Sequence, residues 1–237
     1  MKRNLMRDLE NWTSREAPRD VRLEGRFLEL QPFVAAKHAE ALWQALGGAA
    51  GINERLRYFP CPVFQSVSDF TQWLESNQGS WVTLVASNRT TGEIVGMASY
   101  MRIDTANGVI EVGSVAHGAS VARKPAATEL HYLMARHVFE DLGYRRYEWK
   151  CHDDNRPSKR AAGRLGFTFE GVFRQHMISK GANRDTAWYA MIDEDWPVIG
   201  QALKNWLSRD NFDPAGNQRQ TLEEIRAAFI AGERTDS

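Results

Sequence analysis

The sequence has little of what several classes of site require. It contains only two cysteines, Cys61 and Cys151, which lie far apart and have no CxxC partner. This usage predicts neither a disulfide framework nor a cysteine zinc site, so we expect two half-buried thiols. His131, His137 and His152 show no metal-ligand spacing, and no bound metal is therefore expected.

An excess charge of one sign and a long apolar run are also missing. Thirty Lys and Arg residues balance thirty Asp and Glu residues, which removes the overall attraction that non-specific nucleic-acid binding uses. No apolar run could span a bilayer, and the opening MKRNLMRDLENWTSRE lacks the apolar centre of a secretory signal. We therefore expect a cytoplasmic protein with no membrane partner and no direct nucleic-acid partner.

The composition is that of a globular domain. Apolar residues make up 43% of the chain and charged residues 25%, so the chain can bury a core and need not be disordered. With 237 residues, we expect one domain and an appendage.

The first half of the chain alternates between two periodicities. Short apolar runs bounded by turn residues predict strands at 27–33, 81–86, 94–101 and 109–115. Apolar residues at helical spacing predict helices at 35–46 and after Ser66 or Ser68, with an irregular segment at 51–62.

One charged residue interrupts the last of these strands. In 109–115 every second side chain should face the same way, so Glu111 is expected to share a face with Val109 and Val115. A carboxylate is thereby placed on the surface of the sheet.

The second half predicts helices and strands in alternation. Helices are expected at 126–143 and 157–165, and strands at 147–151, 167–173 and 188–192. Residues 195–237 should form a helical appendage, with a polar linker at 210–218 and a capped amphipathic helix at 221–230. The whole order describes an α/β sheet with mixed strand directions.

An ordered set of short motifs accompanies these elements. Ala126-Ala127-Thr128-Glu129-Leu130 opens the long helix, and Asn155-x-x-Ser158 is followed by Leu165-Gly166-Phe167, Glu170-Gly171 and Arg184-Asp185. Over roughly residues 26 to 194, this set resembles the GCN5-related N-acetyltransferase (GNAT) superfamily. Within the superfamily it is most similar to the branch of ribosomal-protein alanine acetyltransferases (RimJ/RimL-like).

The resemblance implies an α/β fold with a mixed, mostly antiparallel, splayed sheet flanked by helices. It implies an N-terminal arm at 1–25, an acyl-CoA N-acyltransferase domain at 26–194 and a helical C-terminal extension at 195–237. The strands ending near Val115 and His152 should part, and acyl-CoA should bind between them. The implied reaction moves the acetyl group of acetyl-CoA to a primary amine, and the alternative is a non-catalytic acyl-CoA-binding protein.

The start of the long helix is the expected phosphate site. A helix N-terminus offers unpaired N–H groups and a positive dipole, here joined by Arg123 and Lys124, although a solvated basic turn is the plainer interpretation. The resemblance adds Ala126, Ala127 and Thr128 as cofactor-binding residues.

This loop departs from the usual family pattern. Ala122 stands where a basic or amide residue is usual, and Pro125, which has no N–H, stands where glycine is usual. Arg123 and Lys124 can compensate through charge-assisted bonds to phosphate.

Two residues are candidates for proton transfer. Acyl transfer to an amine needs a base for the ammonium and benefits from a donor to the leaving thiolate. Glu111 is the candidate base, or else a structural carboxylate paired with an arginine of a neighbouring strand. Ser158 is the candidate acid, or else a serine that satisfies backbone groups in the first helical turn. The tyrosine that serves as acid in many members is replaced by Ala162.

Further contacts to the cofactor follow from the resemblance. Asn155 can bond the pantetheine arm or a neighbouring backbone group. The backbone of Val115, Ala116 and His117 should pair with the pantetheine amides like an added strand and contact the thioester carbonyl. The imidazole of His117 is either a base or ordinary polar surface.

The sequence does not identify the acceptor. A small amine or a protein N-terminus is expected, bound by a monomer or a homodimer, and the C-terminal extension either closes over the cleft or makes a dimer contact. The aromatic residues Trp43, Tyr58, Phe59 and Trp81 can line an acceptor pocket or belong to the core. An RNA adaptor using the basic stretch 156–160 is disfavoured by the zero net charge.

Overall fold

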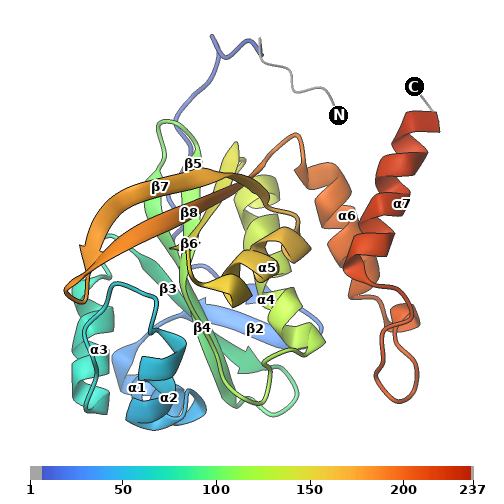
Figure 1. Ribbon diagram of the computed structural model, residues 1–237. Helices are drawn as coiled ribbons and strands as arrows, with labels where there is room; N and C mark the ends of the chain where they lie inside the picture. Colours follow the sequence, from blue (N-terminus) through green and yellow to red (C-terminus); the bar gives the residue numbers. More distant parts are fainter. Residues whose placement is uncertain (1–6, 236–237) are drawn as a thin grey trace.

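The computed structural model describes residues 7–235, which form one eight-stranded sheet with helices on both faces (Figure 1). The strand order is β1-β2-β3-β4-β5-β6-β8-β7. The strands are β1 Leu23–Glu24, β2 Leu28–Pro32, β3 Val82–Asn88, β4 Ile94–Asp104, β5 Val109–His117, β6 Arg146–His152, β7 Thr168–Ser179 and β8 Ala182–Ile192. The helices are α1 Ala35–Ala45, α2 Gly48–Arg55, α3 Val67–Ser76, α4 Pro125–Arg136, α5 Arg156–Leu165, α6 Trp196–Trp206 and α7 Leu222–Thr235.

Strands β5 and β6 form the parallel pair of this otherwise antiparallel sheet. They pair from Val109 with Arg146 to Val112 with Trp149. Beyond this point β5 continues to His117 and β6 to His152 without pairing with each other, while β6 is paired with β8 along its whole length. The sheet therefore opens into a V at the carboxyl ends of the two strands. The mixed α/β fold with a splayed sheet is confirmed.

A β-bulge at Ser114 changes the facing of β5. Across from β4, Ser99 pairs with Gly113 but Met97 pairs with Ala116, so β5 holds one extra residue, and Ser114 has φ 50°. Such a bulge disrupts the ladder locally and bends the strand. The expectation that Glu111 and Val115 share a face is therefore wrong, because Val115 packs on the α4 side of the sheet.

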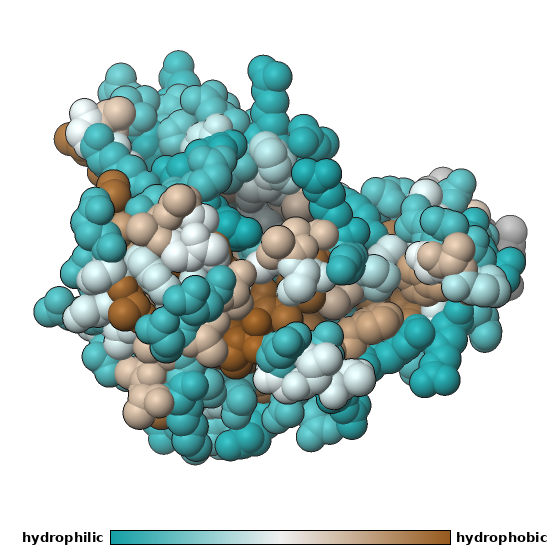
Figure 2. Space-filling model, turned by 90° about the horizontal axis from the view of Figure 1, so that it is seen from below, coloured by the Kyte–Doolittle hydropathy of each residue, from teal (hydrophilic) through white to brown (hydrophobic). Residues whose placement is uncertain are grey.

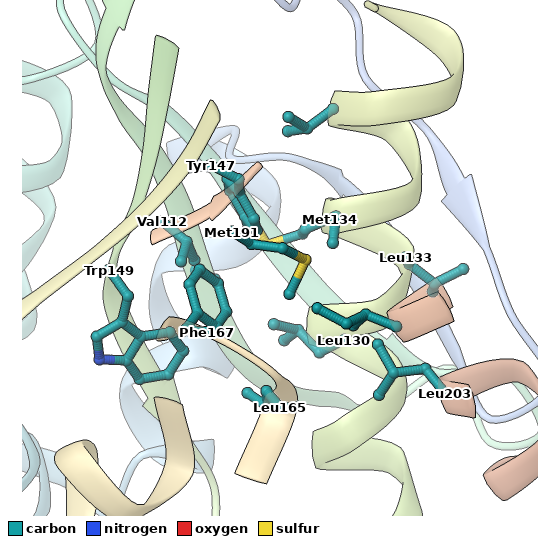
Figure 3. Packing of buried hydrophobic residues seen from close by; sticks show 14 of the residues in the cluster. Val112, Leu130, Leu133, Met134, Tyr147, Trp149, Leu165, Phe167, Met191 and Leu203 are labelled. Atoms are coloured by element: carbon teal, nitrogen blue, oxygen red, sulfur yellow. The ribbon is translucent and has the colours of Figure 1, made fainter. Parts of the chain in front are cut away.

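Two apolar clusters cover the two faces of the sheet. On one face α4 covers the strands and α6 packs on α4, and Figure 3 shows Met134 of α4 turned toward Tyr147. On the other face α1, α2 and α3 cover the strands, with buried Leu42 and Phe70. Burying a side chain of this size stabilises the fold by about 1.5–3 kcal/mol.

Three helices, not the expected two, follow β2. Gly47 ends α1 in the left-handed region with φ 87°, and α2 begins directly afterwards at Gly48. Helix α2 therefore covers the first part of the segment 51–62, which was expected to be irregular. Helix α3 begins at the expected cap, because Ser66 and Asp69 form a reciprocal capping box. The long helix expected over 126–143 is regular α-helix only as far as Arg136. It continues as a π-helical turn, His137–Asp141.

A buried carboxylate of α4 holds the turn before β2. Glu129 is 3% exposed, and its side chain accepts hydrogen bonds from the backbone N–H groups of Arg26, Phe27 and Leu28 at 2.6–2.8 Å. Gly25 lies against the same carboxylate, where a Cβ atom would collide with it. Glu129, part of the motif that opens the long helix, therefore has a structural role.

The two ends of the described chain both pack on the sheet layers. The N-terminal arm is fixed by the indole of Trp12, which donates to the carbonyl of Ala106, and by β1, which pairs with β2. In the C-terminal extension, Trp206 and Leu222 join the apolar cluster of α4. None of the helices in residues 7–235 is long and apolar enough to cross a membrane.

Candidate functional site

The V between β5 and β6 contains a cavity of about 90 Å³, here called the gap cavity. Its floor is the bulged part of β5 and the end of β6, and α5 closes one side. Because the bulge and the splay leave β5 without a neighbour on this side, its backbone groups face the gap. The lining residues that matter below are Val115, Trp149, Cys151, Asn155, Ser158 and Arg184.

Ser158 is held in the gap cavity by a tryptophan. The indole Nε1 of Trp149 donates a hydrogen bond of 2.9 Å to the Ser158 hydroxyl oxygen. Since the hydroxyl accepts from the indole, its own proton can be donated, and the Cys151 sulfur lies within hydrogen-bond reach of it. The structure therefore places a hydroxyl donor in the gap cavity, on the first turn of α5.

Asn155 places the start of α5. It is the N-cap residue, and its side-chain oxygen accepts from the backbone N–H of Ser158 at 3.1 Å. This contact is the neighbouring-backbone alternative of the sequence analysis, and it fixes Ser158 one turn inside the helix. Asn155 still lines the gap cavity.

A larger cavity of about 690 Å³ lies at the N-terminus of α4 and is here called the helix-end cavity. Arg123, Lys124 and Thr128 line it, and Arg123 adopts φ 62° in the turn before the helix. The first-turn N–H groups and the dipole of α4 favour an anion here. Arg164 of α5 adds a third cation to the lining and donates to the Thr128 hydroxyl at 3.0 Å.

The C-terminal extension forms the outer wall of the helix-end cavity. Trp206, Phe212, Asn217 and Gln218 line it opposite α4. In the view from below, the extension is the lobe at the right, and an apolar surface lies between this lobe and the main body (Figure 2). The extension therefore contributes to the helix-end cavity, whereas its described residues do not line the gap cavity. Closure over the gap and a dimer contact both stay predictions.

Two histidines, His117 and His131, line the helix-end cavity, and both are neutral at pH 7. Burial lowers the pKa of His117 to about 4, with the charge of Arg55 acting in the same direction. Burial lowers the pKa of His131 to about 3, with His117 and Arg164 as smaller causes. Their rings lie 5.7 Å apart. An imidazole with such a low pKa is a weak base at neutral pH.

The low pKa of His131 predicts a loss of stability in mild acid. The unfolded chain binds a proton near pH 6.5 but the folded protein does not, so stability is full above pH 6.5 and falls toward pH 3. At pH 5 this single group should cost about 2 kcal/mol. Thermal melting of the wild type and His131→Gln at pH 7 and pH 5 measures it. An equal pH dependence in both proteins would contradict the assignment.

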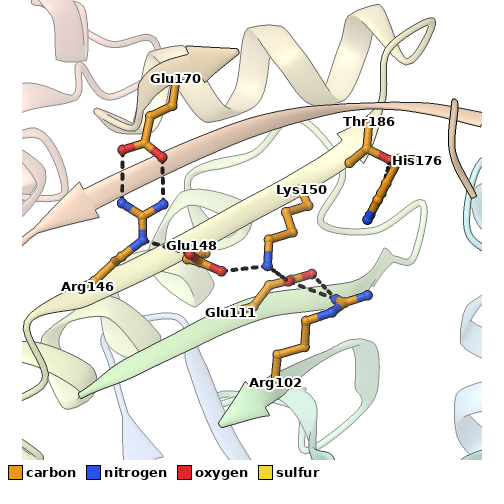
Figure 4. Close-up of polar contacts among 8 residues, drawn as sticks. All are labelled: Arg102, Glu111, Arg146, Glu148, Lys150, Glu170, His176 and Thr186. Carbon is orange, nitrogen blue, oxygen red and sulfur yellow. Dashed lines mark hydrogen bonds and ion pairs between the residues drawn. The ribbon is translucent and has the colours of Figure 1, made fainter. Parts of the chain in front are cut away.

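A third cavity of about 80 Å³, the Glu111 cavity, lies next to the gap cavity. Glu111 is 3% exposed. Its carboxylate accepts a hydrogen bond from Arg102 at 2.8 Å and forms an ion pair with Lys150 at 2.8 Å. Lys150 also bonds Glu148, so a chain of alternating charges runs across the sheet (Figure 4). The arginine partner matches the structural alternative for Glu111, while its position in a cavity matches the catalytic one.

The architecture around these cavities has relatives of known family. The acetyltransferase (GNAT) domain family matches residues 28–168 of the chain. This chain belongs to the GNAT acetyltransferase superfamily. A GCN5-related N-acetyltransferase from Brucella melitensis is 43% identical, with a TM-score of 0.88 over 92% of this chain and 100% of that one.

Two further structures of GNAT relatives extend the comparison. A GNAT-family acetyltransferase from Chromobacterium violaceum is 32% identical, with a TM-score of 0.75 over 83% of this chain and 98% of that one. The microcin C7 self-immunity acetyltransferase MccE, solved in complex with acetyl-CoA and AMP, is 26% identical, with a TM-score of 0.60 over 71% of this chain and 93% of that one.

The residues predicted for the GNAT site fall into the three cavities. The helix-end cavity is lined by His117, Arg123, Lys124, Ala127 and Thr128, the gap cavity by Val115, Asn155 and Ser158, and the Glu111 cavity by Glu111. Ala126 lines none of these cavities, because it is buried in the apolar cluster beneath α4.

Sequence reasoning missed the cations of the Glu111 cavity. Lys150 and Arg184 line both the gap cavity and the Glu111 cavity, and Arg102 lines the latter. Lys150 lies in the strand expected at 147–151, where a charged residue among apolar neighbours is the signal that was available. Arg184 was noted only as part of the Arg184-Asp185 motif.

Proposed function

We propose that this GNAT protein is an acetyl-CoA-dependent N-acetyltransferase that acts on a primary amine. The single observation that carries the proposal is the bulged end of β5, which keeps its pairing with β4 but has no strand partner on the β6 side, and which lines a gap between a cationic helix N-terminus and a buried carboxylate. The relative solved with acetyl-CoA supports the choice of acyl donor.

The residues present suit a coenzyme A thioester. Ser114 has a buried hydroxyl oxygen and His131 a buried Nδ1 for which the described residues provide no hydrogen-bond partner; Ser114 lines the gap cavity and His131 the helix-end cavity. Arg123 and Lys124 with the first turn of α4 would hold phosphate groups. When bound, the thioester would supply an activated acetyl group.

Glu111 is the proposed acceptor of the proton of the attacking ammonium. Arg102 and Lys150 already donate to its oxygens, so we infer that the proton reaches it through a bridging water. The amine nitrogen then forms the bond to the acetyl carbon as the carbon–sulfur bond breaks, and the backbone of β5 would donate to the thioester oxygen. The nitrogen loses its second proton in this step, and that proton returns through water to Ser158 to replace the one given to the sulfur.

Ser158 is the proposed donor to the departing sulfur. Its hydroxyl accepts from Trp149 and can give its proton to a thiolate in the gap cavity. Ser158→Ala should lower kcat by about 10²-fold, the lower end of the usual contribution of a positioned acid. Ser158→Thr, which keeps the hydroxyl, is the control. An unchanged kcat in Ser158→Ala would remove Ser158 from the mechanism.

The acceptor is proposed to be a small amine or a protein N-terminus, in line with the likeness of the motifs to ribosomal-protein alanine acetyltransferases. The cytoplasm is the proposed location, because Cys61 and Cys151 are free and buried rather than paired. No step of the proposed reaction requires a metal, since Glu111 and Ser158 carry both proton transfers.

Calorimetric titration with acetyl-CoA, followed by thiol release with a panel of amines and amino-terminal peptides, tests this function. Binding with thiol release that depends on an amine is the expected result. Binding with no release for any acceptor would favour the alternative, a non-catalytic acyl-CoA-binding protein. Absence of binding at millimolar acetyl-CoA would contradict both.

A further inference from the structure

One cation of the site lacks partners for its hydrogen-bond donors. Arg184 on β8 is 6% exposed, and neither its Nε nor its Nη1 finds an acceptor within the part of the chain that the structure describes. Leaving buried donors of a charged group without acceptors costs free energy. A ligand that supplies the acceptor would remove this cost.

The neighbouring charges are already balanced without Arg184. The chain of ion pairs in Figure 4 contains three carboxylates and three cations in alternation: Glu170, Arg146, Glu148, Lys150, Glu111 and Arg102. Arg184 is not part of this row of ion pairs, so it adds one positive charge that the three carboxylates of the row do not neutralise. Burial lowers the pKa of the Arg184 guanidinium; the charge of Arg102 acts in the same direction, whereas Cys151 and Glu111 oppose it. An arginine nevertheless stays protonated in proteins.

The position of Arg184 joins the two sites of the proposed reaction. Its side chain lines the gap cavity, where Ser158 lies, and the Glu111 cavity, where the proposed base lies. The walls of the Glu111 cavity include the apolar side chains of Phe59, Trp81 and Met101. The cavity thus offers a carboxylate and an unpaired guanidinium within one small, partly apolar space.

We propose that the amine acceptor carries a carboxylate and that Arg184 binds this carboxylate through its unpaired N–H groups. This inference rests on the function proposed above and narrows its substrate class to small amino-carboxylic acids. Charge-assisted bonds from arginine to a carboxylate are among the stronger hydrogen bonds in proteins. The ammonium end of such a molecule is complementary to Glu111.

Matched pairs of acceptors test the inference in the full-length wild-type protein. Glycine and β-alanine are compared with glycinamide and β-alaninamide, which have nearly the same shape but no negative charge. We expect the better amino acid to exceed its amide in kcat/KM by on the order of 10- to 100-fold. Dipeptides with Asp or Asn after the amino-terminal residue show whether the carboxylate of a peptide side chain is accepted instead.

Substitution of Arg184 assigns the effect to this residue. Arg184→Met should bring the ratio of amino acid to amide close to one while leaving the KM for acetyl-CoA unchanged, and Arg184→Lys should keep part of the preference. Arg174→Met, on the exposed part of β7, is the matched control and should behave as wild type. A rise in the KM for acetyl-CoA of Arg184→Met, with the amino-acid preference intact, would overturn the inference.

Failure of the inference can be told from failure of the proposed function. Thiol release with amides equal to that with amino acids would overturn the carboxylate site and leave the N-acetyltransferase function standing. Absence of thiol release with every amine would contradict the function. In that case, calorimetric titration of the wild type and Arg184→Met with β-alanine and β-alaninamide shows whether Arg184 binds a carboxylate. Binding of β-alanine alone, lost in Arg184→Met, supports it, and equal or absent binding of the two probes overturns it.

Discussion

Glu111→Gln is expected to lower kcat/KM by about 10²–10⁴-fold, the usual contribution of a positioned general base. The amide keeps the shape of the side chain and can still accept a bond from Arg102, but it cannot take a proton from the bridging water. Lys150 retains Glu148 as a partner, so the fold should lose only about 1–3 kcal/mol. Steady-state kinetics with acetyl-CoA and an active amine measure the change.

Glu148→Gln is the matched control for this prediction. Glu148 lies directly opposite Glu111 in the β5–β6 pair and shares Lys150 with it, but it does not line the Glu111 cavity. We expect a similar loss of stability in both variants and a large loss of activity in Glu111→Gln alone. If the two variants lose activity equally, Glu111 is a structural carboxylate and another group is the base.

Glu129→Ala is expected to destabilise the protein by about 3–5 kcal/mol, the range for breaking a buried hydrogen-bond network. The substitution leaves the backbone N–H groups of Arg26, Phe27 and Leu28 without their acceptor. These groups lie between β1 and β2, so the edge of the sheet should loosen first. Urea unfolding of the two proteins measures the difference.

Ser87→Ala is a control for the Glu129 prediction. Ser87 is also buried beside β2, but its hydroxyl makes a single long bond of 3.4 Å to the carbonyl of Glu29. It should cost about 1 kcal/mol or less, as a single neutral bond does. A Glu129→Ala variant as stable as Ser87→Ala would show that the carboxylate does not hold the turn.

The sequence predicted most elements because their periodicity was local. The sequence predicts helix α3 from a cap at Ser66 or Ser68, of which the structure uses Ser66, and the long helix from its apolar stripe, since both signals lie within a few residues. Helix α2 was missed because Gly47 and Gly48 were interpreted only as a stop. Gly47 ends α1 in the left-handed region, and the chain re-enters a helix at once.

The bulge at Ser114 had no signal in the sequence. A strict alternation over 109–115 was the natural expectation, and only the pairing of Met97 and Ser99 with β5 reveals the extra residue. A bulge depends on the register between two strands, which side-chain spacing along one strand does not contain.

The site residues show the same limit. Ser158 and Asn155 were predicted because a short motif carries them, and both line the gap cavity. The partners of the two proposed catalytic residues both lie on β6: Trp149 bonds Ser158 of α5, and Lys150 pairs with Glu111 of β5. These contacts depend on how the strands and helices assemble, which the spacing within one element does not contain. The Nε and Nη1 groups of Arg184 are unpaired because its neighbours in the described structure offer them no acceptor oxygen, and a single sequence does not reveal which residues those neighbours are.

Isotopically labelled acetyl-CoA shows whether the gap between β5 and β6 is a site for acetyl transfer to an amine. The protein is incubated with the labelled thioester and a panel of amines, and the nitrogen-linked acetyl product is measured by mass spectrometry. We expect label on the amine nitrogen, at a rate that falls strongly in Glu111→Gln. Label that remains entirely on coenzyme A, in a protein shown to bind acetyl-CoA, would contradict it.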